Sequence, residues 1–373
     1  MAGGLHHRLY AGAVRVLVAM SGGVDSSVAA ALVRQAGHQA VGVTLKLWGG
    51  DGDSGCCSVA DVDDARRVAD RLDLDHHVFN LADRFDEAVV RPYVAAHGRG
   101  ATPNPCIECN RAIKFGALLD RALRLGFDAI ATGHHARLVT GPAGPRLARG
   151  RDRAKDQSYV LAMLERPQLD RLLLPVGELT KAAVRRLAAD LGLRTASKPD
   201  SQDVCFIRSD EGRAGFLAGR VELNPGEVVD AGTGQVVGRV DAVELVTLGQ
   251  RRGLSPGGGG SRRYAVAVDV PGRRVVVGSA EQAMADRVRV GRLTAVDRPR
   301  QLPAGTSVLV QGSAYGPVHL ASVPPVDPAA AVDGAEAEVR FEQPCRPVAP
   351  GQTVAFYDPE APDVVVGSAV ATG

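Results

Sequence analysis

Short runs of β-branched residues alternate with helical patterns over the first third of the chain, and this alternation is the strongest constraint on its fold. Strands are expected at residues 14–20, 40–47, 76–79 and 128–132. The spacing of apolar residues between them predicts helices over 26–35, 62–72, 84–95 and 110–125. Such alternation favours a doubly wound parallel sheet with helices on both faces. The functional residues are therefore expected at the carboxyl ends of the strands, where sheets of this kind bind ligands.

A second pattern begins near residue 205, where helical periodicity stops and short Val-rich runs separated by Gly, Pro and Asp follow. These runs predict all-β structure. The chain has 373 residues, enough for two or three domains. The expected divisions are a tail at 1–13, a catalytic α/β domain at 14–211, a central β-rich domain at 212–281 and a C-terminal β domain at 282–373.

The charges of the chain nearly cancel, at 44 Lys and Arg against 42 Asp and Glu, so the total charge predicts no polyanionic partner. Their distribution is uneven. Three stretches are basic, 91–124, 137–155 and 239–274, and the second of them carries six Lys or Arg against one Asp. Segregated charge of this kind can attract a ligand rich in phosphates, although for any single stretch solvated surface arginines are the better explanation.

Targeting and redox features predict a cytoplasmic protein that does not enter a membrane. The sequence contains no run of about 18 apolar residues, which a membrane-spanning helix requires. Six cysteines are too few for a disulfide scaffold in a chain of this size. In a reducing compartment they are expected to be buried apolar residues, metal ligands or reactive thiols.

The segment SGGVDSS, residues 21–27, lies between the first expected strand and the helix that follows it. Backbone N–H groups in a glycine turn at a helix N-terminus can hold phosphate oxygens. Asp25 could orient the turn or hold Mg²⁺. The sequence is neither a dinucleotide loop nor a Walker P-loop. It resembles the loop of the ATP pyrophosphatase superfamily, whose members cleave ATP between its α- and β-phosphates and adenylate an acceptor oxygen.

Three cysteines stand out from the other three by their surroundings. Cys106 and Cys109 form a C-x-x-C within TPNPCIECN, directly before the expected helix at 110. A helix N-terminus favours thiolate over thiol, so both sulfurs are expected to be reactive or ligated. A structural zinc site needs four ligands, and the sequence contains no second C-x-x-C to complete one. The alternative that the two thiols form a redox pair remains open. Cys205 lies in SKPDSQDVCF, where it is either a third reactive thiol or a buried structural residue.

The whole set of motifs resembles one family, the tRNA-specific 2-thiouridylases. The segments that carry the resemblance are SGGVDSS, TPNPC-x-x-CN with IKF, ATGHHA at 131–136, KDQSYVL at 155–161, KPDSQDVCF, GQRRGL at 249–254 and PGQ at 350–352. They occur in the order found in that family. The resemblance implies a sheet of the ATP pyrophosphatase type, a central β-rich domain and a C-terminal β-barrel.

The resemblance also implies an activity and its site. ATP would adenylate the C2 oxygen of the wobble uridine of tRNA, with Mg²⁺, and sulfur would then displace AMP to give 2-thiouridine. The implied ATP-binding residues are Ala19, Met20, Ser21, Gly22, Gly23, Val24, Asp25, Ser26, Leu45 and Gly133. The implied contacts to tRNA are Asn104, Pro105 and Cys106 at the target base, with His134, Lys155, Asp156, Gln157, Arg340, Phe341 and Gln352 elsewhere. Implied partners are the tRNA anticodon loop and a sulfur donor such as a cysteine desulfurase or a sulfur carrier.

The resemblance likewise implies that Cys109 is the catalytic thiol and that Cys205 carries the persulfide. It implies that these two cysteines form a disulfide during the reaction. One residue departs from the common pattern, because many members have Asp where this chain has Cys106. Three thiolates at 106, 109 and 205 would suffice to hold a four-iron four-sulfur cluster with one open iron. The persulfide and the cluster mechanism both remain open at this point.

Two other functions compete with this interpretation. An amidating ligase such as a GMP or NAD synthetase would share the phosphate loop but would need neither the cysteines nor KDQSYVL. A non-catalytic RNA-binding or metal-sensing protein would need only the basic stretches. RNA-dependent turnover of ATP to pyrophosphate would separate them.

Overall fold

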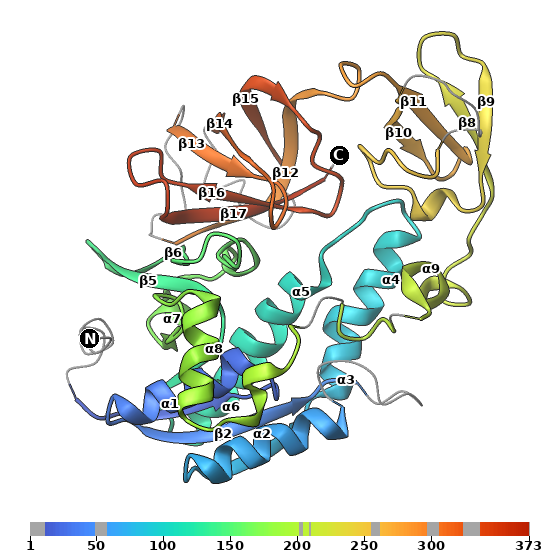
Figure 1. Cartoon of the computed structure of the whole chain (residues 1–373). Coiled ribbons are helices and arrows are strands. Elements are labelled where there is room, and N and C mark those ends of the chain that lie inside the picture. Colours follow the sequence, from blue (N-terminus) through green and yellow to red (C-terminus); the bar gives the residue numbers. More distant parts are fainter. Residues whose placement is uncertain are drawn as a thin grey trace. The chain divides into compact units, whose positions relative to one another are not determined.

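The computed structural model describes residues 12–48, 58–200, 204–208, 210–254, 262–296, 306–323 and 336–372 (Figure 1). The chain forms two compact units. The first comprises Met1–Val89, Cys106–Asp210 and Asp363–Val366, and the second comprises Val90–Pro105, Glu211–Pro362 and Gly367–Gly373. The divisions expected from the sequence at 211/212 and 281/282 stay predictions.

The first unit contains a five-stranded parallel sheet, as the alternation of strands and helices predicted. Its strand order is β3-β2-β1-β4-β7. The strands are β1 (Arg15–Ala19), β2 (Gln39–Lys46), β3 (His76–Asn80), β4 (Ala129–Ala131) and β7 (Leu172–Leu173). The chain runs outward from β1 in one direction through β2 and β3, and then returns to the other side of β1 with β4. The carboxyl ends of β1 and β4 therefore flank the switch point, where doubly wound sheets bind ligands.

Three helices pack together on one face of this sheet: α1 (Val24–Gln35), α2 (Val59–Arg71) and α8 (Lys181–Asp190). Their apolar side chains form one core with Val16, Val18 and Met20, which alternate along β1 and the turn after it. Leu17, between them, is fully buried as well. Because successive side chains of a strand point to opposite faces, both faces of β1 are covered, as expected of a central parallel strand.

Two of the expected helices contain π-helical stretches in the structure. The helix expected from residue 110 begins earlier, as α5 (Pro105–Glu108), because proline is favoured in the first turn of a helix. It continues as a π-helix, η3 (Cys109–Leu118), and ends as α6 (Leu119–Arg124). The helix expected at 84–95 likewise consists of α3 (Ala82–Phe85), a π-helical turn η2 (Asp86–Val90) and α4 (Arg91–His97).

The remaining elements of the first unit are short. A hairpin of β5 (Ala136–Gly141) and β6 (Gly144–Arg149) follows the turn after β4. The single turns are η4 (Tyr159–Leu161), α7 (Arg166–Leu169) and η5 (Arg194–Ser197).

The second unit is almost entirely β, as predicted from the Val-rich runs. A four-stranded sheet has the order β10-β11-β8-β9, with β8 (Gly226–Asp230), β9 (Val236–Val240), β10 (Tyr264–Asp269) and β11 (Arg274–Gly278). A closed antiparallel barrel has the order β12-β15-β14-β13-β16-β17. Its strands are β12 (Ala285–Ala295), β13 (Thr306–Gln311), β14 (Val318–Val323), β15 (Ala337–Cys345), β16 (Thr353–Tyr357) and β17 (Val365–Ala371). The helical elements outside these sheets include α9 (Gly212–Leu217) and η6 (Val243–Leu245).

None of the helices in the described part of the chain is long and apolar enough to cross a membrane.

Gly133 brings the end of β4 against the start of α1. A Cβ atom built on this glycine would lie 2.5 Å from the backbone nitrogen of Ser26 and 2.6 Å from the carbonyl carbon of Asp25. Real Cβ atoms do not approach backbone atoms this closely, so any side chain here must displace the N-terminus of α1. Glycine at this position therefore allows the end of β4 and the start of α1 to lie in direct contact.

We predict that Gly133→Ala destabilises the first unit by about 1–3 kcal/mol, because overpacking a rigid backbone contact forces a shift of the main chain. Thermal unfolding of the purified variant measures the effect. Gly12→Ala is the matched control, since its added Cβ meets no atom within 4 Å. Equal melting temperatures for the two variants would contradict the close approach.

Candidate functional site

The turn between β1 and α1 presents backbone donors at the switch point. Gly22 adopts a φ of 72°, which allows the chain to reverse, and a Cβ there would lie 2.3 Å from the Asp61 carbonyl oxygen. Gly23 precedes α1 and supplies no side-chain cap. The Ser26 hydroxyl accepts a hydrogen bond from the Ser21 N–H at 3.1 Å, which closes the turn. The first N–H groups of α1 follow this turn, and the N-terminus of a helix can bind an anion.

A cavity of about 270 Å³ opens beside this turn. Most of the residues expected to bind ATP line it: Ala19, Met20, Ser21, Asp25, Ser26, Leu45 and Gly133. The other three expected residues are not in the lining, because Gly22 and Gly23 form the turn itself and Val24 begins α1. The loop from β1, the strand β2 and the turn after β4 thus converge on one space, as the positions of their carboxyl ends require.

The cavity also includes residues that were not expected at an ATP site. His134 and Gln157, expected to contact tRNA, line it together with Thr44, Lys114 and Thr132. Lys114 lies in the π-helix five positions after Cys109, and π-helical hydrogen bonds join residues of that separation. The sequence predicts a regular α-helix there, and this prediction does not distinguish Lys114 from its neighbours as a residue of the site.

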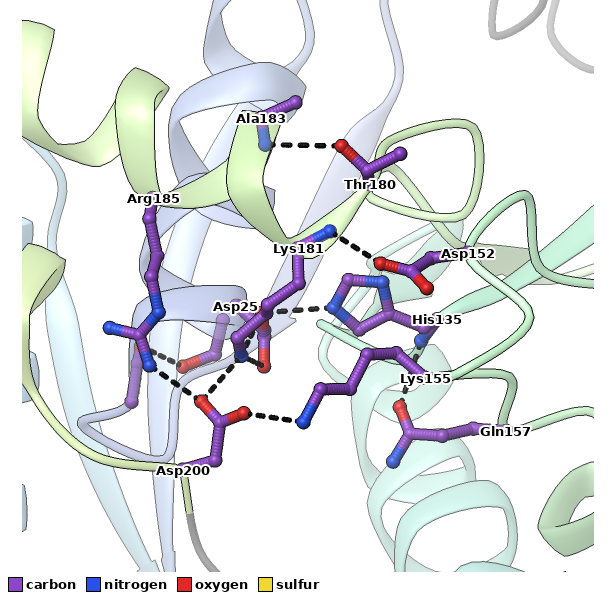
Figure 2. Close-up of polar contacts among 12 residues, drawn as sticks. Asp25, His135, Asp152, Lys155, Gln157, Thr180, Lys181, Ala183, Arg185 and Asp200 are labelled. Atoms are coloured by element: carbon purple, nitrogen blue, oxygen red, sulfur yellow. Dashed lines mark hydrogen bonds and ion pairs between the residues drawn. The ribbon is translucent and has the colours of Figure 1, made fainter. Parts of the chain in front are cut away.

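Asp25 is the centre of a buried charge network in which cations come from distant parts of the chain (Figure 2). His135 Nε2 lies 3.0 Å from Asp25 Oδ1, and Lys181 Nζ lies 2.8 Å and 2.6 Å from the two carboxylate oxygens. Burial opposes ionisation of Asp25, but its hydrogen bonds with His135 and Lys181 outweigh burial and lower its pKa. Asp25 is therefore a carboxylate at neutral pH.

Lys181 is shared with a second carboxylate. Its ammonium lies 2.8 Å from Asp200, which also pairs with Lys155 and Arg185 at 2.8 Å each (Figure 2). Burial again opposes ionisation, and the hydrogen bonds from Lys155 and Lys181 outweigh it, so the pKa of Asp200 lies well below its ordinary value. Asp200 belongs to the KPDS segment that leads toward Cys205.

Lys198, in the same segment, attaches it to the phosphate loop. Its ammonium donates to the carbonyl oxygen of Gly22 at 3.0 Å and to Asp61 and Asp64 of α2 at 2.7 Å each. Burial lowers the pKa of Lys198, but the hydrogen bonds to Asp61 and Asp64 outweigh this effect and raise it. The segment before Cys205 thus contacts the phosphate loop through two cations, Lys181 and Lys198, neither of which sequence reasoning had selected.

His134 is buried and held neutral. Burial lowers its pKa well below the ordinary value, and the positive charges of Lys114 and His135 act in the same direction. Its Nδ1 lies 2.7 Å from the hydroxyl of Thr132. A neutral imidazole in the cavity wall can donate or accept a hydrogen bond but carries no charge for a phosphate backbone.

The KDQ residues 155–157 have three different environments. Asp156 is buried and accepts hydrogen bonds from Gly150 and from the backbone and hydroxyl of Ser158, at 2.8–3.0 Å. It therefore holds the turn together. Gln157 accepts from the His135 N–H at 2.8 Å. Lys155, whose side chain is 38% exposed, is the most accessible of the three, although it is paired with Asp200.

The cations of the basic stretch 137–155 are partly used inside the first unit. Arg137 and Arg153 both bind Asp363, and Arg149 pairs with Asp156. The stretch therefore presents less free positive charge than its sequence suggests.

The three selected cysteines all belong to the first unit. Cys106 is exposed in the first turn of α5, Cys109 is buried at the start of the π-helix, and Cys205 is half-buried in a turn. Neither Cys109 nor Cys205 is part of a disulfide in this structure, so the disulfide expected during the reaction is not formed here. Cys56 and Cys57 lie outside the described residues.

The other expected tRNA contacts belong to the second unit. Asn104 is half-buried and Pro105 is buried. The Gln352 side chain donates to the Thr102 carbonyl oxygen, and the Thr102 N–H donates to Pro350 at 2.8 Å. The segment before Asn104 and the turn that carries Gln352 therefore lie side by side. On β15, Arg340 is exposed and pairs with Glu338, whereas Phe341 is buried beside His319.

We predict that Asp200→Asn lowers the stability of the first unit by about 1–3 kcal/mol at pH 7, because three cations lose their shared anion. The pKa of Asp200 is lowered in the folded state. Its stabilising effect is therefore present above its ordinary value of 3.8 and is lost as the pH falls through the folded-state value. Urea unfolding between pH 7 and pH 3 should show the difference from wild type shrinking below about pH 4.

The control for this measurement is Asp210→Asn, which removes a similar pair with Arg208 at 2.8 Å from an exposed position. Exposed ion pairs contribute about 0–1 kcal/mol, so this variant should unfold nearly as wild type does. A loss as large as that of Asp200→Asn would show that partial burial does not distinguish the two carboxylates.

Comparison with known proteins identifies the family. Residues 14–209 match the tRNA methyl transferase HUP domain, residues 214–279 the tRNA methyl transferase PRC-barrel domain, and residues 322–371 the aminomethyltransferase beta-barrel domain. The tRNA-specific 2-thiouridylase MnmA of Salinispora tropica is 47% identical over 366 residues, which cover 95% of this chain and 98% of the relative. Its counterpart in Mycobacterium sp. (strain JLS) is 47% identical over 376 residues, covering 96% and 99%. The chain belongs to the family of tRNA-specific 2-thiouridylases.

Proposed function

We propose that the protein uses ATP to convert the wobble uridine of tRNA into 2-thiouridine, releasing AMP and pyrophosphate. The observation that carries this proposal is the cavity at the switch point, which is formed by the SGGVDSS turn in a chain whose relatives are 2-thiouridylases over nearly their full length. The protein is accordingly a sulfurtransferase that acts on tRNA.

Adenylation solves the chemical difficulty of this reaction. The C2 oxygen of uracil is a poor leaving group, and its attack on the α-phosphate of ATP turns it into part of AMP, which leaves readily. The new P–O bond forms as the bond to pyrophosphate breaks. The N–H groups at the start of α1 would bind the phosphates, while Lys114, which lines the same cavity, would supply positive charge.

Magnesium fits the donor set at this place. Mg²⁺ is usually held by one or two carboxylates together with substrate phosphates. Asp25 is ionised and is the carboxylate among the described residues that line the cavity. When bound with ATP, Mg²⁺ would neutralise phosphate charge, and Asp25 would hold it from the first turn of α1.

For the sulfur step, we propose that Cys205 carries a persulfide supplied by a cysteine desulfurase or a sulfur carrier. The Cys109 thiolate attacks the inner sulfur of this persulfide, forming the Cys109–Cys205 disulfide and releasing hydrosulfide. Hydrosulfide attacks C2 of the adenylated uridine, and AMP departs. A thiol reductant then returns both cysteines to the free state. Burial of Cys109 at the start of the π-helix would keep the released sulfur away from bulk water.

A four-iron four-sulfur cluster does not fit the residues as they are arranged. Within the described ranges, no group of three or more His, Cys, Asp or Glu side chains is placed to hold a metal ion. Cys106 is exposed whereas Cys109 is buried, although they are three positions apart. The proposed sulfur step accordingly uses the persulfide.

For tRNA, we propose that the target base meets the segment Asn104, Pro105 and Cys106. A uridine in the anticodon loop can leave its stack at low cost, which gives the enzyme access to C2. His134, at the base of the cavity, would contact this nucleotide as a neutral hydrogen-bonding group. Lys155, Asp156, Gln157, Arg340, Phe341 and Gln352 remain the proposed contacts outside the pocket, with Asp156 and Phe341 acting through the segments that they hold in place.

The proposal predicts that the purified protein, given ATP, a persulfide donor and unmodified tRNA, forms 2-thiouridine and AMP in equal amounts. Nucleoside analysis by mass spectrometry measures the product. Cys109→Ser and Cys205→Ser should each reduce it by at least about 10³-fold, since a hydroxyl cannot carry sulfane sulfur. Cys345→Ser is the control, because Cys345 lies in the barrel. If wild-type protein consumes ATP with tRNA but forms no thiolated uridine, the proposed function is wrong.

A second variant tests the persulfide route. Cys106→Asp removes a thiol that the persulfide transfer does not use and keeps a polar side chain at the proposed contact with the base, so most of the activity of aerobically prepared enzyme should remain. Turnover and the visible absorption spectrum are measured on the same preparations. A joint loss of visible absorbance and activity in this variant would instead support a cluster.

A further inference from the structure

The peptide group between Gly22 and Gly23 in the SGGVDSS turn has no side chain on either side to fix its orientation. Turning a peptide plane over changes the ψ of the residue before it and the φ of the residue after it, and here both residues are glycines. Gly22 adopts a φ of 72° and Gly23 a φ of −96°. Glycine populates positive and negative φ about equally, so the local sequence allows both orientations of this peptide. A contact from outside the turn must therefore select one.

Lys198 provides that contact. Its ammonium donates to the Gly22 carbonyl oxygen at 3.0 Å and to the carboxylates of Asp61 and Asp64 at 2.7 Å each. Both acidic residues belong to α2, and Gly22 packs closely on that helix, since a Cβ on it would lie 2.3 Å from the Asp61 carbonyl oxygen. The ammonium thus holds together three oxygen atoms that would repel one another in its absence.

The backbone of this lysine is fixed as well. The Lys198 N–H donates to the Thr195 carbonyl oxygen at 3.1 Å, and the Lys198 carbonyl oxygen accepts from Arg185 of α8 at 2.9 Å. The side chain is 30% exposed. Lys198 is therefore a fixed cation that reaches the turn from a part of the chain 176 positions away.

The direction of the Gly22 carbonyl sets the direction of the next N–H group. In a planar trans peptide the C=O and N–H bonds point in opposite directions. The carbonyl points to Lys198, so the Gly23 N–H points away from it. Ser21 and Ser26 of the same turn line the cavity, whereas Lys198 and its two acidic partners are not among the described residues that line it. The carbonyl is thus held on the α2 side of the turn, and the N–H group lies on the other side.

We propose that Lys198 is a positioning residue of the nucleotide site, which holds the Gly22 carbonyl against α2 and so presents the Gly23 N–H to a phosphate oxygen of ATP. Without the ammonium, the peptide would turn over, because its N–H could then donate to the carboxylate of Asp61 or Asp64. Its carbonyl oxygen would face the phosphates and repel them. The inference rests on the proposed function insofar as ATP is the nucleotide that binds here.

The first test observes the Gly23 amide of the wild-type protein by NMR after selective ¹⁵N labelling of glycine. The resonance is assigned by its loss in Gly23→Ala. ATP added without tRNA should shift it, because the amide proton gains a charged acceptor. The amide of Gly37, which follows the far end of α1, should hardly move. An unchanged Gly23 resonance in protein saturated with ATP would overturn the inference.

The second test measures ATP binding by calorimetry, again without tRNA. Lys198→Met should bind ATP about 10- to 100-fold more weakly, which is the change in the binding-competent fraction that one hydrogen bond to a charged group can cause. Arg34→Met is the matched control. It removes an equal charge from the last turn of α1, where Arg34 pairs with Asp73 at 3.1 Å in an exposed position, and should stay within about twofold of wild type. Wild-type affinity in Lys198→Met would contradict the positioning role.

A double variant separates the orientation of the peptide from simple charge. Gly23→Ala fits the present orientation, because φ is negative there and the nearest atom to an added Cβ, apart from chain neighbours, is Ser21 Oγ at 3.5 Å. The turned-over peptide would need a positive φ at this position, which is unfavourable for any residue with a Cβ. The loss of affinity caused by Lys198→Met should therefore be at least about fivefold smaller when it is combined with Gly23→Ala. An equal loss with and without Gly23→Ala would show that Lys198 acts only through its charge and would overturn the inference.

None of these measurements needs tRNA or a sulfur donor. A wild-type protein that does not bind ATP would contradict the proposed function itself. A protein that binds ATP and forms 2-thiouridine but fails the tests above would remove this inference alone.

Discussion

The ion pair between Asp25 and Lys181 is the interaction on which the organisation of the site depends. Asp25 is half-buried in the first turn of α1, and an isolated carboxylate there would be disfavoured. His135 from the turn after β4 and Lys181 from the start of α8 provide its partners. These three residues come from widely separated parts of the chain. Their pairing therefore fixes the positions of the phosphate loop, the β4 turn and α8 relative to one another inside the first unit.

The glycines of the site complement these charges. Gly22 and Gly133 place backbone atoms of neighbouring segments closer than any side chain would permit. Charge holds the segments together, and the absence of Cβ atoms lets them approach. The cavity lined by the residues of this turn, by Gly133 and by Lys114 results from both effects.

The sequence predicted the architecture well because its signals are local. The alternation of Val-rich runs with helical patterns placed the ends of β1 to β4 within one or two residues. The loss of helical periodicity near residue 205 marked the start of the β structure. SGGVDSS predicted the glycine turn between β1 and α1 for the same reason, since strand, turn and helix start are contiguous.

Contacts between residues that are far apart in the sequence could not be predicted in this way. Lys181 pairs with Asp25 across 156 positions, and Lys198 reaches Gly22 across 176. No local pattern encodes such pairs, although a lysine at the first position of a helix was a visible irregularity. The π-helix at Cys109–Leu118 was also missed, because its apolar spacing is close enough to that of an α-helix to be taken for one. Burial of Phe341 and Asp156 could be known only once their surroundings were folded.

The boundary between the two compact units falls inside the TPNPCIEC motif, between Pro105 and Cys106. Residues before this point are held by the second unit, where Thr102 bonds to the turn at Pro350 and Gln352. The first and the second unit therefore cannot each be exchanged for an equivalent part of another protein without affecting this segment. Cutting the gene after the α/β region would remove the support of the segment ahead of the cysteines, and a barrel from another protein would replace it only if it reproduced that turn.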